Sequence, residues 1–181
     1  MTSTETITPF LSGFLSQWYH SPFVIDNIKY DTAEHYMMAE KARLFEDYEI
    51  LEKILKTDTA KEVKRLGRLV KNFDDSLWKK HARDIVFKGN LAKFQQNPIM
   101  KAKLLNTNDS ILVEGNKDDP VWAVKLSDKD PKIMDPYQWK GTNWLGQVLM
   151  GVRITLGGQK PTLGQYQNSG LIEYYIPKSI K

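Results

Sequence analysis

The feature that most constrains the fold is a series of short amphipathic segments between residues 31 and 105, most of them opened by a capping residue. Asp31, Thr59 and Asp74 each stand where an N-cap is needed, just ahead of a run in which apolar side chains recur at helical spacing. Pro98 interrupts the series, and proline suits the first turn of a new helix. The pattern predicts helices over about residues 34–45, 48–56, 60–70, 77–96 and 98–105.

The rest of the chain predicts one more helix and a few short strands. Residues 23–25 and 28–30 flank Asp26-Asn27 as in a hairpin. The other expected elements are strands at 110–113, 121–126 and 174–176, a loop at 127–140 and a helix at 143–155. We therefore expect a mainly α-helical chain with three parts: a flexible N-terminus at 1–9, one domain at 10–157, and a C-terminal extension at 158–181 that packs on it.

Composition excludes several classes of protein. The chain has 181 residues, 41% of them hydrophobic, which is typical of one soluble domain with a substantial core. No apolar run is long enough to span a membrane and the N-terminus lacks a signal-peptide pattern, so we expect no membrane association and a cytoplasmic protein, or a nuclear one in a eukaryote. With no cysteine and three scattered histidines, we expect no thiolate nucleophile, no metal and no cofactor.

The charge balance points to anionic partners. The net charge is +4 and the isoelectric point is about 9.1, which favours phosphates, nucleotides or nucleic acid. The lysines are spread along the predicted helices, so we expect a general attraction for phosphate and no polybasic arm.

The helix that follows Asp31 carries the strongest candidate site. Glu34 and Lys41 are about two helical turns apart and fall on the same face, with an apolar floor between them. A lysine in apolar surroundings loses proton affinity and can act as a nucleophile, and a nearby glutamate can move a proton. Two structural roles compete with this interpretation: a solvated charge pair, and a capping box in which Glu34 is the partner of Asp31.

Two further segments could line a pocket. An aromatic loop contains Phe14 and Trp18-Tyr19, and an acidic turn between Glu114 and Asp119 precedes Trp122. Aromatic faces stack on planar bases, although any single tryptophan is more often a core anchor. Gly141 opens the last predicted helix, whose first amides could bind phosphate or could simply be capped.

Three stretches together resemble one known family. They are FLSQWYHSPFVIDNIKYDTAEHYMMAEKARLF, KFQQNPIMKAKLLNTNDSILVEGNKDDPVWAVKLS and WKGTNWLGQVLMGVR. In this order they are similar to the NADAR family, also called YbiA-like N-glycosidases, over about residues 10–155. The resemblance implies a single-domain orthogonal helical bundle with a few short strands.

The resemblance also implies an activity, the hydrolysis of an N-glycosidic bond between ribose and an exocyclic amine of a base. The expected substrate is ADP-ribosylated guanine in DNA or RNA, so the partner is ADP-ribosylated nucleic acid or an ADP-ribose-like nucleotide, and we expect a monomer. Ribosylaminopyrimidine intermediates of riboflavin biosynthesis are the alternative substrate. A non-catalytic module that binds ADP-ribose or nucleic acid is the alternative from another class.

By resemblance, Lys41 is the amine that forms a Schiff base with the sugar, and three carboxylates are candidates for proton transfer and ribose binding: Glu34, Glu114 and Asp119. The expected substrate-binding residues are Phe14, Trp18, Tyr19, His35, Trp122, Asn143 and Gly146. The chain departs from the family after Trp122, where Ala123-Val124 replaces a common Gly-x-Gly and could narrow that wall.

Overall fold

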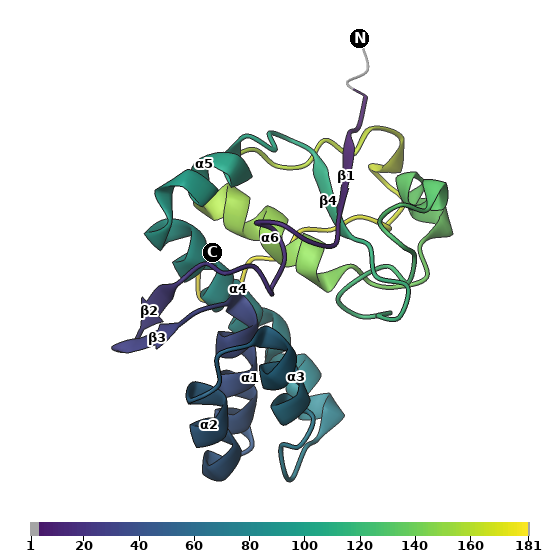
Figure 1. Ribbon diagram of the computed structural model, residues 1–181. Helices are drawn as coiled ribbons and strands as arrows, with labels where there is room; N and C mark the ends of the chain where they lie inside the picture. Colours follow the sequence, from purple (N-terminus) through teal and green to yellow (C-terminus); the bar gives the residue numbers. More distant parts are fainter. Residues whose placement is uncertain (1–3, 181) are drawn as a thin grey trace. The chain divides into compact units, whose positions relative to one another are not determined.

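The computed structural model describes residues 4–180, which form two compact units (Figure 1). One unit combines the chain up to Ser16 with the chain from Ile99 onward, and the other is Gln17–Pro98. The described residues form six α-helices and four short strands, so the predicted mainly α-helical class is confirmed. None of these helices is both long and apolar enough to cross a membrane.

The hairpin of the Gln17–Pro98 unit forms where the sequence predicts it. Strands β2 (Phe23–Ile25) and β3 (Ile28–Tyr30) pair antiparallel. Asp26 and Asn27 between them have φ angles of 51° and 63°. Two successive left-handed residues are what a type I′ turn requires, and asparagine and aspartate tolerate that conformation best after glycine.

Four helices complete this unit, and each has a side-chain cap. They are α1 (Ala33–Leu44), α2 (Tyr48–Leu55), α3 (Ala60–Gly67) and α4 (Asp75–Gln96). The cap predicted for α1 is wrong by one residue, because Thr32 accepts the His35 amide at 3.1 Å while the Asp31 carboxylate pairs with Lys29 at 3.6 Å. Glu34 is therefore the second helical residue, and its interpretation as the partner in a capping box is also wrong.

Helix α1 is the central element of the unit. It contacts α2, α3 and α4, and Figure 1 shows it between α2 and α3. Every residue from Ala33 to Ala39 is buried, so the helix has no solvent face over its first two turns. A helix buried all round must place its polar side chains against other parts of the protein, which makes Glu34 and His35 notable.

Two glycines allow the neighbouring helices to approach α1 closely. A Cβ on Gly67 of α3 would lie 2.1 Å from the Met38 sulfur, and a Cβ on Gly89 of α4 would lie 2.6 Å from the Tyr36 ring. The Tyr36 ring is held on its other sides by Phe23 and Tyr30, at centroid distances of 6.2 Å and 5.2 Å. Gly89 therefore allows the close contact between α4 and α1.

The second unit is built on a parallel pair of strands. β1 (Ile7–Phe10) pairs with β4 (Ile111–Glu114), and helix α6 (Trp144–Thr155) packs against β4. Its other elements are α5 (Pro98–Leu105), which starts at the boundary of the two units, and the short 3-10 helices η1 (Pro131–Met134), η2 (Pro136–Gln138) and η3 (Gly164–Tyr166). β1 begins inside the segment expected to be flexible, which corrects that boundary for residues 7–9; residues 1–3 lie outside the described part of the chain.

Two predicted strands do not form. Residues 121–126 are irregular because the carbonyls of Val121, Trp122 and Ala123 accept hydrogen bonds from the start of α6 instead of from a strand. Residues 174–176 are also irregular. They lie against α6, where the Tyr175 amide donates to the Gln147 carbonyl at 2.9 Å and the absent side chain of Gly151 leaves room for the Tyr175 carbonyl.

Candidate active site

The side chain of Lys41 lies among aromatic rings. Its Nζ is 4.5 Å from the centroid of Phe73, which follows α3, and 5.7 Å from that of Trp78 in α4. The lysine is half-buried, and burial is the main cause of a lowered Lys41 pKa. An amine with a lowered pKa is unprotonated more often at neutral pH, which a nucleophile requires.

Two charged side chains act on this amine in opposite directions. The Glu34 carboxylate raises the pKa of Lys41, whereas the Arg68 guanidinium at the C-terminus of α3 lowers it. Glu34 is 6% exposed, so the carboxylate and the amine interact in surroundings that screen charge poorly. The structure therefore couples the pair of residues that the sequence placed on one helix face.

The aromatic segment at Trp18 lies beside the start of α1. The Glu34 amide donates to the Gln17 carbonyl at 3.0 Å, and the Gln17 side chain reaches the sulfur of Met37 at 3.8 Å. Trp18 itself is 46% exposed, and the Nζ of Lys64 lies 5.8 Å from its ring centroid. Its neighbour Tyr19 is also exposed. Both rings are thus open to a ligand.

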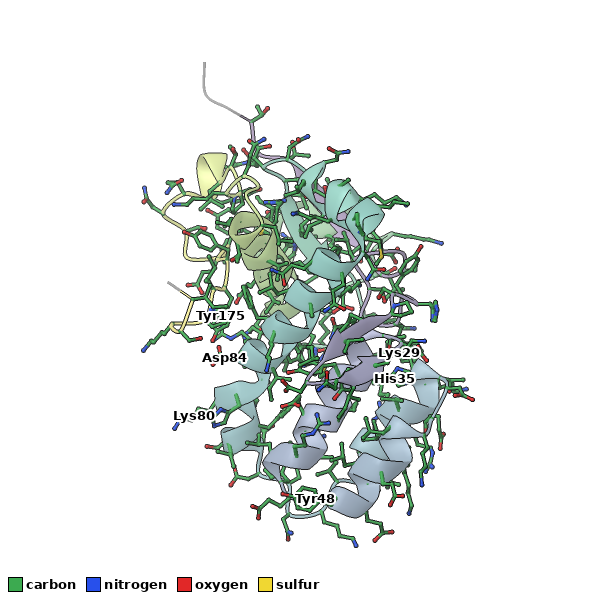
Figure 2. The ribbon with its side chains drawn as sticks, turned by 90° about the vertical axis from the view of Figure 1, so that its left-hand side faces the viewer. Lys29, His35, Tyr48, Lys80, Asp84 and Tyr175 are labelled. Atoms are coloured by element: carbon green, nitrogen blue, oxygen red, sulfur yellow. The ribbon has the colours of Figure 1, made fainter. Side chains whose placement is uncertain are left out.

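His35 has a different environment from the one expected of a substrate ligand. This residue, labelled in Figure 2, lies in the first turn of α1, and both its ring nitrogens face protein oxygens. Nδ1 is 2.7 Å from the Thr32 hydroxyl and Nε2 is 2.8 Å from the Thr57 carbonyl. A carbonyl can only accept, so Nε2 carries the proton and the imidazole ties α1 to the end of α2. This arrangement suits a positioning residue.

Glu114 ends strand β4 and is held there by Asn143. The Asn143 side chain accepts the Glu114 amide at 3.1 Å and donates to the Leu112 carbonyl at 2.9 Å. Asn143 is buried and left-handed, with φ of 53°. A Cβ on Gly146 would lie 2.4 Å from the Asn143 amide nitrogen, so glycine is needed there. Asn143 and Gly146 together fix the backbone of Glu114.

Asp119 organises the acidic turn. Its Oδ1 accepts the amides of Val121 and Trp122, both at 2.9 Å. Trp122 is half-buried, and its ring meets that of Trp144 edge to face with centroids 5.6 Å apart. Asp119 therefore sets the position of Trp122 through the backbone amides that its Oδ1 accepts.

The start of α6 is not an open anion site. The amides of Asn143, Trp144 and Leu145 donate to carbonyls of residues 121–123, each at 3.1 Å. These are the groups that would have to face a phosphate. Of the two roles that the sequence left open for this helix start, the structure supports capping and not phosphate binding, because carbonyls of residues 121–123 accept these amides.

The sequence interpretation missed three residues around Lys41, namely Arg68, Phe73 and Trp78. In the sequence, Trp78 is one of several apolar residues at helical spacing in the predicted helix 77–96, and Phe73 and Arg68 lie in segments without a motif. Six of the predicted site residues belong to the other unit: Phe14, Glu114, Asp119, Trp122, Asn143 and Gly146. There the Nζ of Lys103 lies 5.9 Å from the Phe14 ring centroid. No local signal distinguishes these rings from ordinary core or surface aromatics.

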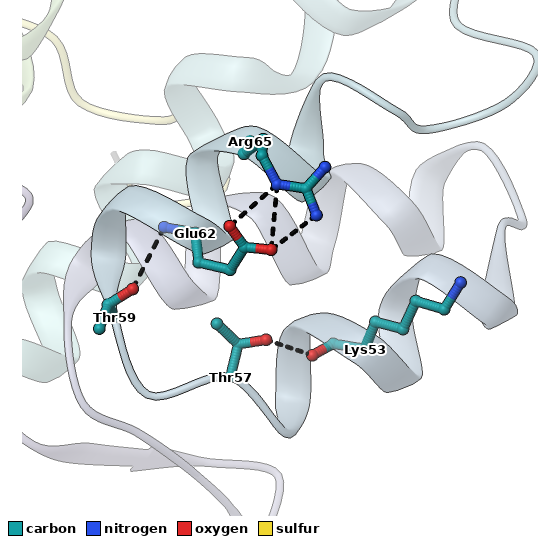
Figure 3. A network of polar contacts seen from close by, with 5 residues as sticks. All are labelled: Lys53, Thr57, Thr59, Glu62 and Arg65. Carbon is teal, nitrogen blue, oxygen red and sulfur yellow. Dashed lines mark hydrogen bonds and ion pairs between the residues drawn. The ribbon is translucent and has the colours of Figure 1, made fainter.

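A groove of about 460 Å³ opens between α2 and α3. Its floor and rim include Ile50, Leu66, Leu69, Lys53, Lys56 and Arg65. The basic groups on its rim are paired within their own helices; Figure 3 shows Arg65 bonded to Glu62, at 2.6 Å in the shortest contact. Lys41, Phe73 and Trp78 do not line this groove, so it is separate from the amine.

Within 4–180, no three histidine, aspartate or glutamate side chains are grouped so as to hold a metal ion. The expectation that turnover needs no metal and no cofactor stays a prediction.

Comparisons with known proteins identify one family and several relatives. The model of the family described as NADAR domain matches residues 8–157. An N-glycosidase of Acanthamoeba polyphaga mimivirus is 41% identical over 125 residues, which cover 69% of this chain and 74% of that protein. The N-glycosidase YbiA of Escherichia coli is 30% identical over 166 residues, which cover 86% of this chain and 92% of YbiA.

A solved structure and one further relative are also similar to this chain. The solution NMR structure of E. coli YbiA matches with a TM-score of 0.71 and 28% identity, over 86% of this chain and 87% of that one. A riboflavin biosynthesis protein of Vibrio vulnificus is 28% identical over 82% of this chain, but the match spans only 37% of that longer protein.

Proposed function

Because the chain belongs to the NADAR family, as the match over residues 8–157 shows, we propose that it is an N-glycosidase that removes ADP-ribose from ADP-ribosylated guanine in nucleic acid. The names of two relatives support the N-glycosidase class. The net charge of +4 favours a substrate that carries phosphate. The observation that carries the proposal is the Lys41 amine, half-buried beside two aromatic rings and coupled to Glu34.

The proposed reaction uses this amine as a nucleophile. When ribose is attached to an exocyclic amine, the sugar ring can open: the C1′–O4′ bond breaks, O4′ takes a proton, and C1′ becomes double-bonded to nitrogen. The lone pair of Lys41 Nζ attacks C1′, and the π electrons of the C1′–base imine pass to the base nitrogen. Both protons of Nζ move in turn to that nitrogen, the bond from C1′ to the base breaks, and C1′ becomes double-bonded to Nζ. Water then adds to the lysine imine, the C1′–Nζ bond breaks, and free sugar and free amine result.

Proton transfer in these steps is assigned to carboxylates. Glu34 is the first candidate, because its charge acts directly on Lys41. Glu114 and Asp119 are further candidates for proton transfer or ribose-hydroxyl binding. Trp18, Tyr19 and Trp122 are proposed to contact the base or the adenine ring by stacking.

The substrate is tested with three reactions run side by side. Release of free ADP-ribose from ADP-ribosylated DNA supports the proposal. Cleavage of a ribosylaminopyrimidine phosphate with no action on modified DNA favours the alternative suggested by the riboflavin biosynthesis protein. Binding of either compound without turnover indicates a binding module.

The nucleophile is tested by substitution and trapping. We expect Lys41→Ala to abolish turnover, and borohydride added during turnover to trap a sugar adduct on the wild-type protein only. Lys53→Ala is the matched control, because Lys53 is an exposed lysine of α2 paired with Glu49 at 2.9 Å. Full activity in Lys41→Ala would refute the Schiff-base route.

A further inference from the structure

Two cations of α3 flank the candidate active site. Lys64 and Arg68 are four residues apart in sequence, so they lie on one side of the helix, about 6 Å apart along its axis. Lys64 lies over the exposed ring of Trp18, and Arg68 acts electrostatically on Lys41. One side of α3 therefore connects the aromatic end of the site with its amine.

The packing of α3 keeps these two side chains beside α1. Helices α1 and α3 are in direct contact, and Gly67, the residue before Arg68, lies against Met38 of α1. Met38 is between Glu34 and Lys41 in the sequence of α1. The contact at Gly67 thus fixes the register that sets Arg68 near Lys41 while Lys64, one turn earlier, meets Trp18.

Lys64 and Arg68 differ from the other basic residues of α2 and α3 that the structure shows in ion pairs. Lys53, Lys56 and Arg65 are each paired with a glutamate of the same helix, at 2.9 Å, 2.5 Å and 2.6 Å. Among the described residues, neither Lys64 nor Arg68 has a carboxylate partner within ion-pair distance. Arg68 is also exposed to solvent. Two unneutralised cations beside a nucleophilic amine are suited to an anionic ligand.

We propose that Lys64 and Arg68 form the phosphate-binding subsite of this active site, holding the phosphate or diphosphate on the sugar while C1′ meets Lys41. The inference rests on the proposed function, and it names the part of the chain that recognises the anionic half of the substrate. It also replaces the start of α6, whose amides are already bonded. Both candidate substrates carry phosphate, so the subsite serves either.

The test compares three substrates in which guanosine carries a sugar on its exocyclic amine. The first carries ribose, the second ribose 5′-phosphate and the third ADP-ribose. We expect Arg68→Gln to raise KM for both phosphorylated substrates by on the order of tenfold, with less than about twofold change for the unphosphorylated one. Arg68→Lys should recover part of the loss, and Lys64→Gln should act mainly on the diphosphate.

Arg65→Gln is the matched control. Arg65 is on the same helix, three residues before Arg68, but it lines the α2–α3 groove and is engaged by Glu62. Its substitution should leave all three KM values within about twofold. If Arg68→Gln raises KM equally for all three substrates, or if Arg65→Gln raises KM for the phosphorylated ones as much, the subsite is elsewhere.

A binding measurement separates this inference from the proposed function. Titration calorimetry with ADP-ribose needs no turnover. If no substrate is cleaved but ADP-ribose binds, and binding weakens in Arg68→Gln and not in Arg65→Gln, the subsite stands and the proposed reaction falls. If substrate is cleaved while ADP-ribose affinity is the same in every variant, the reaction stands and the subsite falls. Failure to bind ADP-ribose or inorganic phosphate at all, in folded wild-type protein without turnover, contradicts both.

Discussion

The Lys41 amine has surroundings that no neighbouring lysine of α2 or α3 shares. Lys53 and Lys56 are exposed and each is paired with a glutamate of its own helix, whereas Lys41 lies over Phe73 with its charge balanced between Glu34 and Arg68. Lys41 is half-buried on the central helix, and the rings of Phe73 and Trp78 lie beside its amine. A nucleophile held in this way is presented to a substrate without the entropy cost of ordering a free side chain.

The balance of charges at this amine is directly testable. We expect Glu34→Gln to lower the pKa of Lys41 further, because it removes the charge that stabilises the ammonium form. The measurement is an NMR titration of the Lys41 side-chain signals in the free protein. Glu40→Gln is the control, since Glu40 is bonded to Arg43 and should leave the Lys41 titration unchanged. A Lys41 pKa that rises in Glu34→Gln would contradict the coupling.

Asp119 shows how one carboxylate can have a structural and a chemical role. Its Oδ1 bonds to two backbone amides, so Asp119→Ala should lower the free energy of unfolding by about 1–2 kcal/mol. Asp119→Asn keeps that oxygen as an acceptor and should leave the melting temperature nearly unchanged. If Asp119→Asn also loses turnover, the charge is needed for chemistry. If it keeps full activity, Asp119 acts only through the turn, and melts with single-turnover rates on both variants decide.

At the scale of elements, the position of α1 depends on two close helix contacts. Gly67 of α3 lies against the flexible side chain of Met38, and Gly89 of α4 lies against the packed ring of Tyr36. The side chains around Lys41 come from these same helices and the segment that joins them. The close contacts therefore also set how far Arg68 and Trp78 stand from the amine.

The two glycines should respond differently to alanine. In Gly67→Ala the Met38 side chain can rotate away, and the gain in helix propensity of about 1 kcal/mol offsets the strain, so we expect little net change. In Gly89→Ala the Tyr36 ring cannot move freely, and overpacking should cost about 1–3 kcal/mol. Urea unfolding of both variants measures the difference. Equal effects would show that Tyr36 repacks as easily as Met38.

At the scale of the whole molecule, stability should depend on the pH because of one fully buried lysine. Lys93 of α4 is 0% exposed, and burial lowers its pKa to about 7. Between pH 7 and the ordinary lysine range, the unfolded chain holds a proton here that the folded chain lacks. Stability from this group therefore increases as the pH rises from about 7 to about 10, and is constant below pH 7.

Lys93→Met tests this, because methionine has similar length and no charge. We expect the variant to be stabilised relative to wild type more at pH 7 than at pH 10, measured as the difference in free energy of unfolding by urea at each pH. Lys88→Met, at an exposed position of the same helix, is the control and should show no such dependence. A pH-independent difference for Lys93→Met would mean that the lysine titrates normally in the folded protein.

Much of this architecture follows from local sequence. The caps Thr59 and Asp74, the hairpin turn at Asp26-Asn27 and the apolar spacing of the four helices in the Gln17–Pro98 unit act over a few residues. The same is true of Glu34 and Lys41, whose common helix face is set by the helical repeat alone. Where the local signal was ambiguous, as between Asp31 and Thr32, the prediction was wrong by one residue.

Tertiary structure decided the remainder, because contacts between distant segments leave no mark on either segment alone. Arg68, Phe73 and Trp78 surround Lys41 only through the packing of α3 and α4 on α1. Residues 121–123 could form a strand by composition, but their carbonyls cap α6 because Asn143 clamps that helix to β4. Sequence thus supplied the amine and its carboxylate, and packing supplied the rings and cations that make the amine a candidate nucleophile.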